Sequence, residues 1–415
     1  MQDTPTREES GLIDSAYAWR RLIAALCIST IANAGMWSGV VVLPSIQAEF
    51  GIARADASLP YTLTMVCFAI GGILMGRLAD RLGIVVPLVI GAIAVGAGFV
   101  AASMSTSIWQ FALIHGLVIG LLGCSAGFGP LIADTSLWFR KRRGLAVSIC
   151  ASGNYLSGVV WPPIVQYITD TAGWRQAYFT VGVAGVSIML PLILALRRRT
   201  PVEYVSPAER IANQSHRPLG LHPTVLMGLL MLAGVACCVA MSMPQVHMVA
   251  YCADLGYGAA RGAEMISLML GCGIVSRLIS GWITDRIGGF AILLLGSTLQ
   301  MLALLLYVPF DGLMSLYIIS ALFGLFQGGI VPAYAIIVRE NYPPNEAGTR
   351  VGAVLMSTLA GMALGGWLSG AVFDYTGSYQ AAFLNGILWN VLNISIVAWL
   401  MSRKRRVPPL VAAPA

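Results

Sequence analysis

Charged residues are scarce in this sequence, and their scarcity excludes an ordinary water-soluble protein. Asp, Glu, Lys and Arg make up 10% of the 415 residues, whereas hydrophobic residues make up 57%. A soluble globular domain carries about 25% charged residues. Because so few charges cannot cover a surface that faces water, we expect most of the surface to face a lipid bilayer.

Motifs for several kinds of chemistry are also absent. No glycine-rich loop with Lys-Ser/Thr occurs, which disfavours ATP-driven transport. The four histidines and eight cysteines show no metal-ligand spacing. The sequence therefore predicts no enzyme, cofactor, metal or disulfide. An intramembrane enzyme would need a nucleophile, an acid and a base gathered within the spans, and no such cluster is found.

Long apolar runs are what the sequence contains instead. A crossing helix needs about 20 apolar residues, and twelve such runs fit the length of the chain. We therefore predict an all-α polytopic membrane protein with twelve transmembrane helices. The predicted spans are 20–43, 59–79, 84–104, 109–133, 144–168, 178–196, 223–249, 262–283, 290–308, 312–335, 350–372 and 380–402.

Basic residues lie almost entirely on one side of these predicted spans. With the N-terminus in the cytoplasm, all but four of the 25 Lys and Arg fall inside, as the positive-inside rule requires. The exceptions are Arg54, Arg175 and Arg261 outside and Arg277 within a span. We predict cytoplasmic termini in a bacterial inner membrane, and we attribute the net charge of +7 to topology rather than to nucleic-acid binding. Asp134 is expected to pair with the basic cluster at 140–143.

The polar stretches divide the chain into two halves. Residues 1–19 are acidic and lack the basic and apolar regions of a signal peptide. One long polar connection holds five Arg, two Glu and three Pro, and we interpret it as a linker. The predicted parts are a tail at 1–19, a six-helix bundle at 20–196, the linker at 197–222, a second six-helix bundle at 223–402 and a tail at 403–415.

An internal repeat indicates that the two halves are related. Residues 76–83 read GRLADRLG after the second span, and residues 281–288 read GWITDRIG after the eighth, 205 positions later. Residues 173–179 and 377–383 match at an offset of 204. Two independent matches at nearly one offset predict parallel repeats, as found in secondary transporters whose substrate site lies between the halves.

These loop motifs resemble the signature of the major facilitator superfamily, and the resemblance covers residues 20–402. It implies two pseudo-symmetric six-helix bundles that move by alternating access. Asp80, Arg81, Asp285 and Arg286 are candidates for a conformational latch, since a charge pair with a neighbouring helix would form in one state only. In a simpler interpretation, the two arginines anchor helix ends.

Arg277 is the ionisable residue placed deepest in a predicted span. It lies eight residues before Asp285, about 12 Å from the end of the helix, and a charge at this depth costs about 3 kcal/mol. No acidic residue of its own span can neutralise it. A guanidinium in this position suits a carboxylate substrate. Alternatively, backbone carbonyls or a carboxylate from another helix hold it.

An arginine in the eighth span followed by the loop motif is similar to the monocarboxylate transporter family and its bacterial relatives, including the oxalate/formate exchanger group. This resemblance implies that Arg277 binds the substrate carboxylate. The animal members carry an aspartate where this chain has Gly273, and a lysine in the first span. The only lysines here are Lys141 and Lys404. The resemblance therefore implies transport of a carboxylate without defining the coupling ion.

Five polar or aromatic residues at helical spacing are further candidates for substrate contacts. They share faces of the first, fifth and tenth spans, and each is as compatible with an interhelical hydrogen bond as with a ligand. These candidates are Asn33, Trp37, Asn154, Gln327 and Tyr334.

His247 is the candidate proton carrier, because a histidine titrates in the physiological range. It follows Pro244 near the outer end of the seventh span, where a broken helix would serve as a gate. A solvated or hydrogen-bonded histidine at the membrane surface is the alternative. Pro162 and Pro163 are expected to break the outer end of the fifth span.

We therefore predict a monomeric secondary transporter that moves a small monocarboxylate by alternating access, with a proton as co-substrate. The alternatives within transporters are an anion exchanger or dicarboxylate transporter of the oxalate/formate type, and a carrier of amphiphilic drugs. Drug exporters often carry a membrane-embedded acid for cations, and its absence favours anions. A receptor without flux would need a large signalling extension, which the short tails do not provide.

Overall fold

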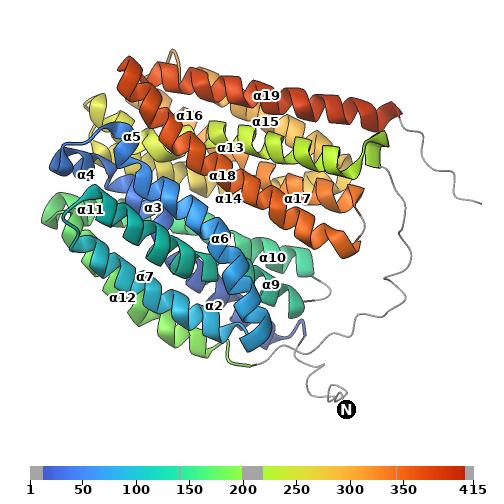
Figure 1. The fold of residues 1–415 in the computed structure, drawn as a ribbon, viewed down its shortest axis with the longest axis horizontal. Coiled ribbons are helices and arrows are strands. Elements are labelled where there is room, and N and C mark those ends of the chain that lie inside the picture. Colours follow the sequence, from blue (N-terminus) through green and yellow to red (C-terminus); the bar gives the residue numbers. More distant parts are fainter. Residues whose placement is uncertain (1–12, 140–141, 199–217, 343, 407–415) are drawn as a thin grey trace, which may run out of the picture.

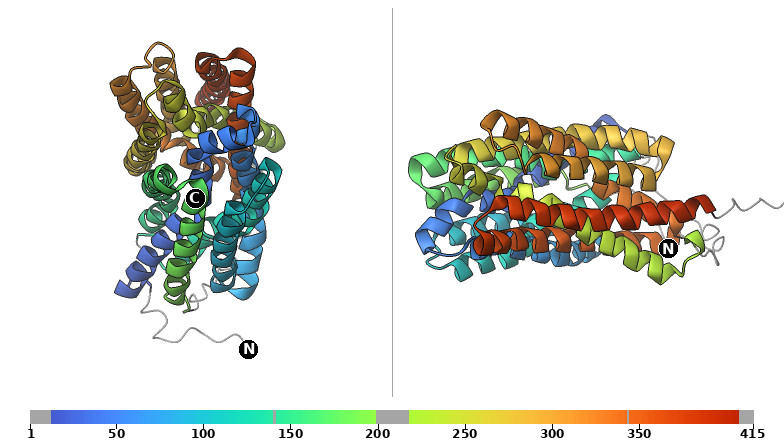
Figure 2. Two further views of the ribbon diagram at one scale, coloured as in Figure 1. Left: turned by 90° about the vertical axis from the view of Figure 1, so that its left-hand side faces the viewer. Right: turned by 90° about the horizontal axis from the view of Figure 1, so that it is seen from above.

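The computed structural model describes residues 13–139, 142–198, 218–342 and 344–406, and within these ranges every regular element is a helix. The helices run roughly along one axis in two groups, which lie one above the other in Figure 1 and stay separate in the end-on view of Figure 2. We call the group before residue 199 the N-bundle and the group after residue 217 the C-bundle.

The N-bundle contains short helices as well as long ones. Its helices are α2 (Ala16–Ala32), α3 (Ala34–Val41), α4 (Leu43–Phe50), α5 (Arg54–Ala57), α6 (Leu59–Leu82), α7 (Val85–Ser103), α8 (Ile108–Leu113), the π-helix η1 (Ile114–Cys124), α9 (Gly129–Leu137), α10 (Arg143–Ala151), α11 (Gly153–Ala172) and α12 (Trp174–Leu194).

The C-bundle begins with a short 3₁₀ turn, η3 (Pro218–Gly220). Its helices are α13 (Pro223–Asp254), α14 (Ala259–Ile287), α15 (Gly289–Leu306), α16 (Leu313–Gln327), α17 (Ile330–Asn341), α18 (Pro344–Thr376) and α19 (Tyr379–Arg406).

Eleven segments of the described chain are long and apolar enough to cross a membrane, and each coincides with a predicted span. The predicted fifth span, 144–168, is formed by α10 and α11 and does not reach that threshold, so its crossing remains a prediction. The first helix begins at Ala16, four residues earlier than predicted, because the Ser15 hydroxyl caps it by accepting a hydrogen bond from the Ala18 amide at 3.3 Å. Most of the predicted linker and both predicted tails lie outside the described residues.

The two loop motifs share one backbone conformation. Gly83 ends α6 at φ 83° and ψ 164°, and Gly288 ends α14 at φ 81° and ψ 165°. A side chain would strain this region of φ. The equal geometry at both positions supports the repeat inferred from the sequence, and it explains the glycine that closes each motif.

The helices are not broken at the prolines where the sequence analysis expected breaks. α11 continues through Pro162 and Pro163, and α13 continues through Pro244, so the predicted breaks at these prolines are wrong. The fifth predicted span is instead interrupted at Ser152, between α10 and α11. A proline kink can be absorbed when neighbouring helices and local adjustments satisfy the freed carbonyl.

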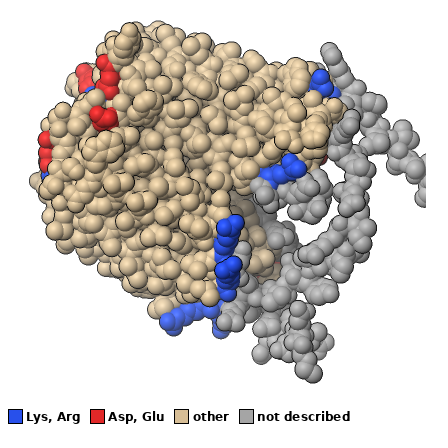
Figure 3. Space-filling model, viewed as in Figure 1, with Lys and Arg blue, Asp and Glu red and all other residues tan. Residues whose placement is uncertain are grey.

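Charged side chains gather at opposite ends of the bundles. Figure 3 shows Lys and Arg at the end nearest the uncertain segments, and Asp and Glu at the other. We call these the basic end and the acidic end. The acidic end holds, among others, Glu49, Asp56, Asp254, Glu264, Asp311 and Asp374, at or near the ends of helices.

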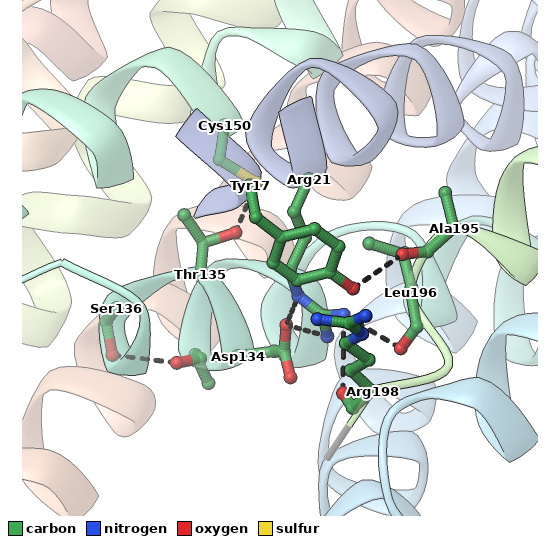
Figure 4. Close-up of polar contacts among 10 residues, drawn as sticks. Tyr17, Arg21, Asp134, Thr135, Ser136, Cys150, Ala195, Leu196 and Arg198 are labelled. Atoms are coloured by element: carbon green, nitrogen blue, oxygen red, sulfur yellow. Dashed lines mark hydrogen bonds and ion pairs between the residues drawn. The ribbon is translucent and has the colours of Figure 1, made fainter. Parts of the chain in front are cut away.

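A buried ion pair holds the basic end of the N-bundle together. The Arg21 guanidinium of α2 lies 2.7 Å from the Asp134 carboxylate of α9 and also donates to the Leu196 carbonyl at 2.8 Å (Figure 4). The Trp138 ring packs against it at 4.5 Å. The described partner of Asp134 is therefore Arg21, 113 residues away in the sequence. The side chains of Arg140, Lys141 and Arg143 lie outside the description, so the expected pairing of Asp134 with the cluster at 140–143 stays a prediction.

Candidate substrate site between two helix breaks

Arg277 lies on α14, partly buried, and reaches toward two interruptions in neighbouring helices. Its Nη1 donates to the Ala151 carbonyl at 3.2 Å, and its Nε points to the Gly328 carbonyl at 3.5 Å. The guanidinium carbon lies 4.1 Å from the centre of the Tyr155 ring. Within the described part of the chain, no carboxylate forms an ion pair with Arg277.

Both carbonyls belong to the C-terminal ends of helices. Ala151 is the last residue of α10, and Gly328 caps α16. The last carbonyls of a helix lack intrahelical donors and carry a partial negative charge, which stabilises a cation. The sequence left two alternatives to substrate binding, and the described residues show the first of them, in which backbone carbonyls hold Arg277. No described residue supplies a full negative charge to neutralise the guanidinium.

The contacts of Arg277 connect the two bundles. Arg277 and Gly328 belong to the C-bundle, whereas Ala151 and Tyr155 belong to the N-bundle. Gly328 fits closely, since a Cβ there would lie 2.3 Å from the Gly273 carbonyl. The guanidinium therefore lies at the junction where the substrate site of a two-bundle transporter is expected.

Two of the predicted substrate-contact residues lie beside this junction. The Trp37 Nε1 of α3 donates to the Asn154 carbonyl at 3.2 Å, on the turn that carries Tyr155. The Asn154 Oδ1 is buried and accepts no hydrogen bond from the described residues. Trp37 also packs against Gly158, where a Cβ would lie 2.9 Å from its ring. Trp37 and Arg277 therefore both contact one stretch of the N-bundle, residues 151–158, which includes Asn154.

Asn33 and Gln327 also lie at helix breaks, Gln327 next to Gly328, and both are fully buried. Asn33 separates α2 from α3, and its Nδ2 donates to the Ser29 carbonyl at 2.7 Å. Gln327 ends α16, and its Oε1 accepts from the Gln245 Nε2 at 2.8 Å. The Asn33 Oδ1 and the Gln327 Nε2 have no hydrogen-bond partner among the described residues, so each keeps one group for a ligand or water.

Tyr334 is not brought to Arg277. Its hydroxyl donates to the Asn393 Oδ1 of α19 at 2.9 Å, inside the C-bundle, and its side chain is fully buried. The helix is not continuous as predicted: Gln327 ends α16 and Tyr334 belongs to α17, with Gly328 and Gly329 between them, and the shared face of the two side chains stays a prediction. Seven residues equal two turns only where the helix is unbroken.

The structure explains why a glycine stands one turn before Arg277. A Cβ at Gly273 would lie 2.6 Å from the Tyr155 ring. The ring that stacks on the guanidinium therefore occupies the space which an acidic side chain at this position would need. Tyr155 was not among the predicted site residues, since one aromatic residue in an apolar span carries no distinguishing signal.

His247 lies toward the acidic end of α13 and is fully buried, so it is not a solvated histidine, while its hydrogen bond to Gly366 agrees with the hydrogen-bonded form of the alternative. Its Nε2 lies 2.8 Å from the Gly366 carbonyl of α18, which identifies this nitrogen as the protonated one, since a carbonyl only accepts. The Nδ1 has no hydrogen-bond partner among the described residues.

Arg54 closes the acidic end between the two bundles, and sequence reasoning did not identify this role. Its side chain is 8% exposed, although it comes from a four-residue helix. The guanidinium lies 3.1 Å from the Asp254 carboxylate and donates to the Tyr379 hydroxyl at 2.5 Å. The Asp374 carboxylate accepts from the Arg54 and Ala55 amides at 2.8 and 2.7 Å. Every one of these partners is on the C-bundle.

The predicted latch residues are only partly described. The side chains of Asp80 and Asp285 lie outside the description, so their pairing remains a prediction. Arg81 is exposed at the end of α6. Arg286 is exposed at the end of α14, and its guanidinium carbon lies 3.8 Å from the centre of the Trp282 ring.

Named transporters are similar in sequence to this chain over most of its length. Monocarboxylate transporter 13 of Bos taurus is 27% identical over 379 residues, which cover 89% of this chain and 86% of the relative. The MFS-type transporter opdF of Penicillium oxalicum is 25% identical over 426 residues, covering 96% and 95%. Both relatives are named as transporters, and neither identity reaches 30%.

Solved structures show the same fold. A bacterial homologue of the human lysosomal transporter Spinster, in an inward-facing and occupied conformation, superposes with a TM-score of 0.71 at 16% identity. The match covers 94% of this chain and 97% of that one. The family model of the Major Facilitator Superfamily matches residues 25–354 and 292–414. With its two helical bundles and its repeated loop motif, the chain belongs to the Major Facilitator Superfamily.

Proposed function

We propose that the protein is a secondary transporter which carries a small monocarboxylate, of the lactate or pyruvate type, across a bacterial inner membrane. The observation that carries this proposal is Arg277, a cation at the junction of the bundles that no described carboxylate neutralises. Its guanidinium offers a planar fork that matches a carboxylate. The similarity to monocarboxylate transporter 13 supports the same substrate class.

The polar contacts between the bundles favour access to this site from the basic end. Arg54 joins the bundles at the acidic end. Eight residues later in the sequence, the Thr62 hydroxyl donates to the Ala363 carbonyl of the C-bundle at 3.2 Å. The deepest contact of this kind among the described residues is that of Arg277 with Ala151. With the basic end in the cytoplasm, this arrangement corresponds to an inward-facing carrier.

Substrate binding exchanges partners at Arg277. A carboxylate that approaches from the basic end takes the Nη2 group, which donates to no described residue, and competes with the Ala151 carbonyl for Nη1. The bound anion neutralises the guanidinium more completely than two helix ends can. The loaded carrier therefore passes through an occluded state at lower cost than the empty one.

His247 is the proposed proton carrier, and symport is the proposed mode of coupling. The charged groups that act on it are Arg54 and Asp374, both part of the closure at the acidic end. A proton on Nδ1 would therefore change the electrostatic field at two groups that hold the bundles together. Together a proton and a monocarboxylate are neutral, so cotransport moves no net charge.

The latch proposal is kept for Asp80, Arg81, Asp285 and Arg286. If these groups stabilise one conformer, Asp80→Asn should slow uptake about tenfold while equilibrium binding stays as in the wild type, since about 1.4 kcal/mol corresponds to tenfold. Unchanged uptake would remove the proposal.

We further propose that the carrier works as a monomer, because each chain contains both bundles.

The test is initial uptake of radiolabelled lactate, pyruvate and oxalate into proteoliposomes, at equal and unequal pH, with the membrane potential clamped. Symport predicts that an inward proton gradient accelerates lactate or pyruvate uptake. An anion exchanger or dicarboxylate transporter of the oxalate/formate type, the second candidate, predicts indifference to the gradient and strong dependence on internal substrate. Proteoliposomes with Arg277→Ala provide the background.

The role of His247 is tested separately with His247→Gln, which can still donate to the Gly366 carbonyl. Loss of acceleration by the proton gradient, with exchange of internal for external substrate retained, would support this assignment. Acceleration equal to that of the wild type would reject His247 as the carrier and leave the substrate class untouched.

A further inference from the structure

A groove on the outside of the C-bundle plays no part in the proposed transport site. It lies between α14, α15 and α16 and encloses about 210 Å³. Its floor contains Ser276, Ser280 and Gly329, and most of its other lining is aliphatic. All three helices belong to segments that can cross the membrane, so the groove lies at the depth of lipid chains.

The rim of the groove faces the bilayer. Ile279, Leu295 and Leu325, one from each helix, are 51%, 44% and 39% exposed. Water in a groove with apolar walls at this depth is unfavourable in free energy, because a buried water needs two to four polar partners. A hydrocarbon chain that enters sideways from the bilayer meets no such cost.

A cation stands at the basic end of the same face. Arg286 follows Ile279 by seven residues, or two turns of α14, so both lie on one side of the helix. The exposed Arg286 guanidinium is stacked on Trp282, itself 59% exposed. Tryptophan at a membrane surface marks the level of the lipid headgroups. The groove therefore ends where a lipid phosphate would meet a guanidinium.

The N-bundle does not repeat this feature, although it shares the loop motif. At the repeat offset of 205 residues, Ser280 corresponds to Met75 and Ser276 to Gly71. Met75 is buried at 4% exposure, and a Cβ at Gly71 would lie 2.1 Å from the Leu121 carbonyl. The larger thioether chain and the close helix contact fill the space that two serines leave open in the C-bundle.

We propose that this groove binds one anionic phospholipid of the leaflet at the basic end, with an acyl chain along Ile279, Leu295 and Leu325 and the phosphate on Arg286. Apolar burial supplies the affinity for the chain, and the charge-assisted hydrogen bonds of Arg286 supply the preference for an anionic headgroup. This inference does not depend on the transported substrate.

The chain-binding part is tested by filling the groove. Purified protein in mild detergent is incubated with phosphatidylglycerol, and bound lipid is counted by native mass spectrometry. We expect one retained lipid in the wild type and at least a fivefold loss in Leu295→Trp. The matched control is Leu302→Trp, on the same face of α15 two turns away and 48% exposed, and it should bind as the wild type does. Equal binding by the two tryptophan variants would overturn the proposal.

Ser280→Met provides a second variant, because it introduces the residue that the N-bundle carries at the equivalent position. It should lower the retained lipid as Leu295→Trp does. Retention equal to that of the wild type would contradict the proposed position of the acyl chain.

The headgroup part is tested by comparing phosphatidylglycerol with phosphatidylcholine. Arg286→Ala should bring retention of phosphatidylglycerol down to that of phosphatidylcholine. Arg81→Ala, the equivalent change in the N-bundle, should leave the difference intact. A preference that survives Arg286→Ala, or that disappears in Arg81→Ala, would refute the role of Arg286.

Discussion

Arg21 and Arg277 both lie inside membrane-spanning helices, but their surroundings differ. Arg21 has a carboxylate at 2.7 Å and lies entirely within the N-bundle. Arg277 has two helix-end carbonyls and an aromatic ring, and its contacts cross from one bundle to the other. A guanidinium already neutralised by an acid contributes to structure. One that is held only by partial charges remains available for an anion.

Arg54 is a third case, because its carboxylate partners belong to the opposite bundle. Its ion pair can persist only while the acidic end is closed. In the proposed transport cycle the three arginines would therefore differ in what happens to their partners: those of Arg21 would move with it, those of Arg54 would separate from it, and those of Arg277 would be replaced by substrate.

Removal of the structural arginine should have the largest effect on stability. Arg21→Ala leaves Asp134 buried without a counter-charge, which costs about 3 kcal/mol. The midpoint of thermal unfolding in detergent should fall accordingly, while Arg21→Lys, which keeps the charge, should lose less. An unchanged midpoint in Arg21→Ala would show that this pair does not hold the basic end together.

Removal of the closing arginine should shift the conformational equilibrium. Arg54→Ala deletes charge-assisted hydrogen bonds worth about 2 kcal/mol, so a conformer with a separated acidic end should become populated. Spin labels at Thr106 and Asp311, exposed in the N- and C-bundles respectively, should show an added longer distance.

The control for Arg54 is Arg261→Ala. Arg261 pairs with Glu264 at 3.0 Å on the surface of the C-bundle alone, and such exposed pairs contribute little. The distance distribution should not change in this variant. A distribution altered equally by both substitutions would contradict the assignment of Arg54.

Exchange of arginine for lysine should affect substrate affinity at Arg277 but not at Arg21. In Arg277→Lys the carboxylate loses one of its two parallel hydrogen bonds, about 1.5 kcal/mol, so substrate affinity should fall about tenfold. Arg21→Lys should leave affinity unchanged in the same binding assay. Equal affinities for the wild type and Arg277→Lys would argue against bidentate recognition.

A smaller effect is expected at Tyr155. Tyr155→Leu removes the ring below the guanidinium, a contact worth about 1 kcal/mol, so affinity should fall roughly fivefold. Gly273→Ala should act in the same direction by displacing that ring. Full affinity in both variants would show that the aromatic ring does not position Arg277.

The sequence predicted the large features because they depend on many residues. Eleven apolar runs appear as membrane-compatible segments, and the loop motif returns as two glycines in the same conformation. The breaks at Ser152 and Gly328 could not be predicted, since neither differs from many other small residues in apolar spans. The burial of Arg54 could not be predicted either, because its partners lie 200 to 325 residues away in the sequence.

The most direct test of the central claim is equilibrium binding of a radiolabelled monocarboxylate to purified wild-type protein and to Arg277→Ala, with thermal unfolding recorded on the same samples. The account predicts saturable binding in the wild type, no saturable binding in Arg277→Ala, and closely similar unfolding midpoints. Saturable binding of near-normal affinity in Arg277→Ala would contradict the account.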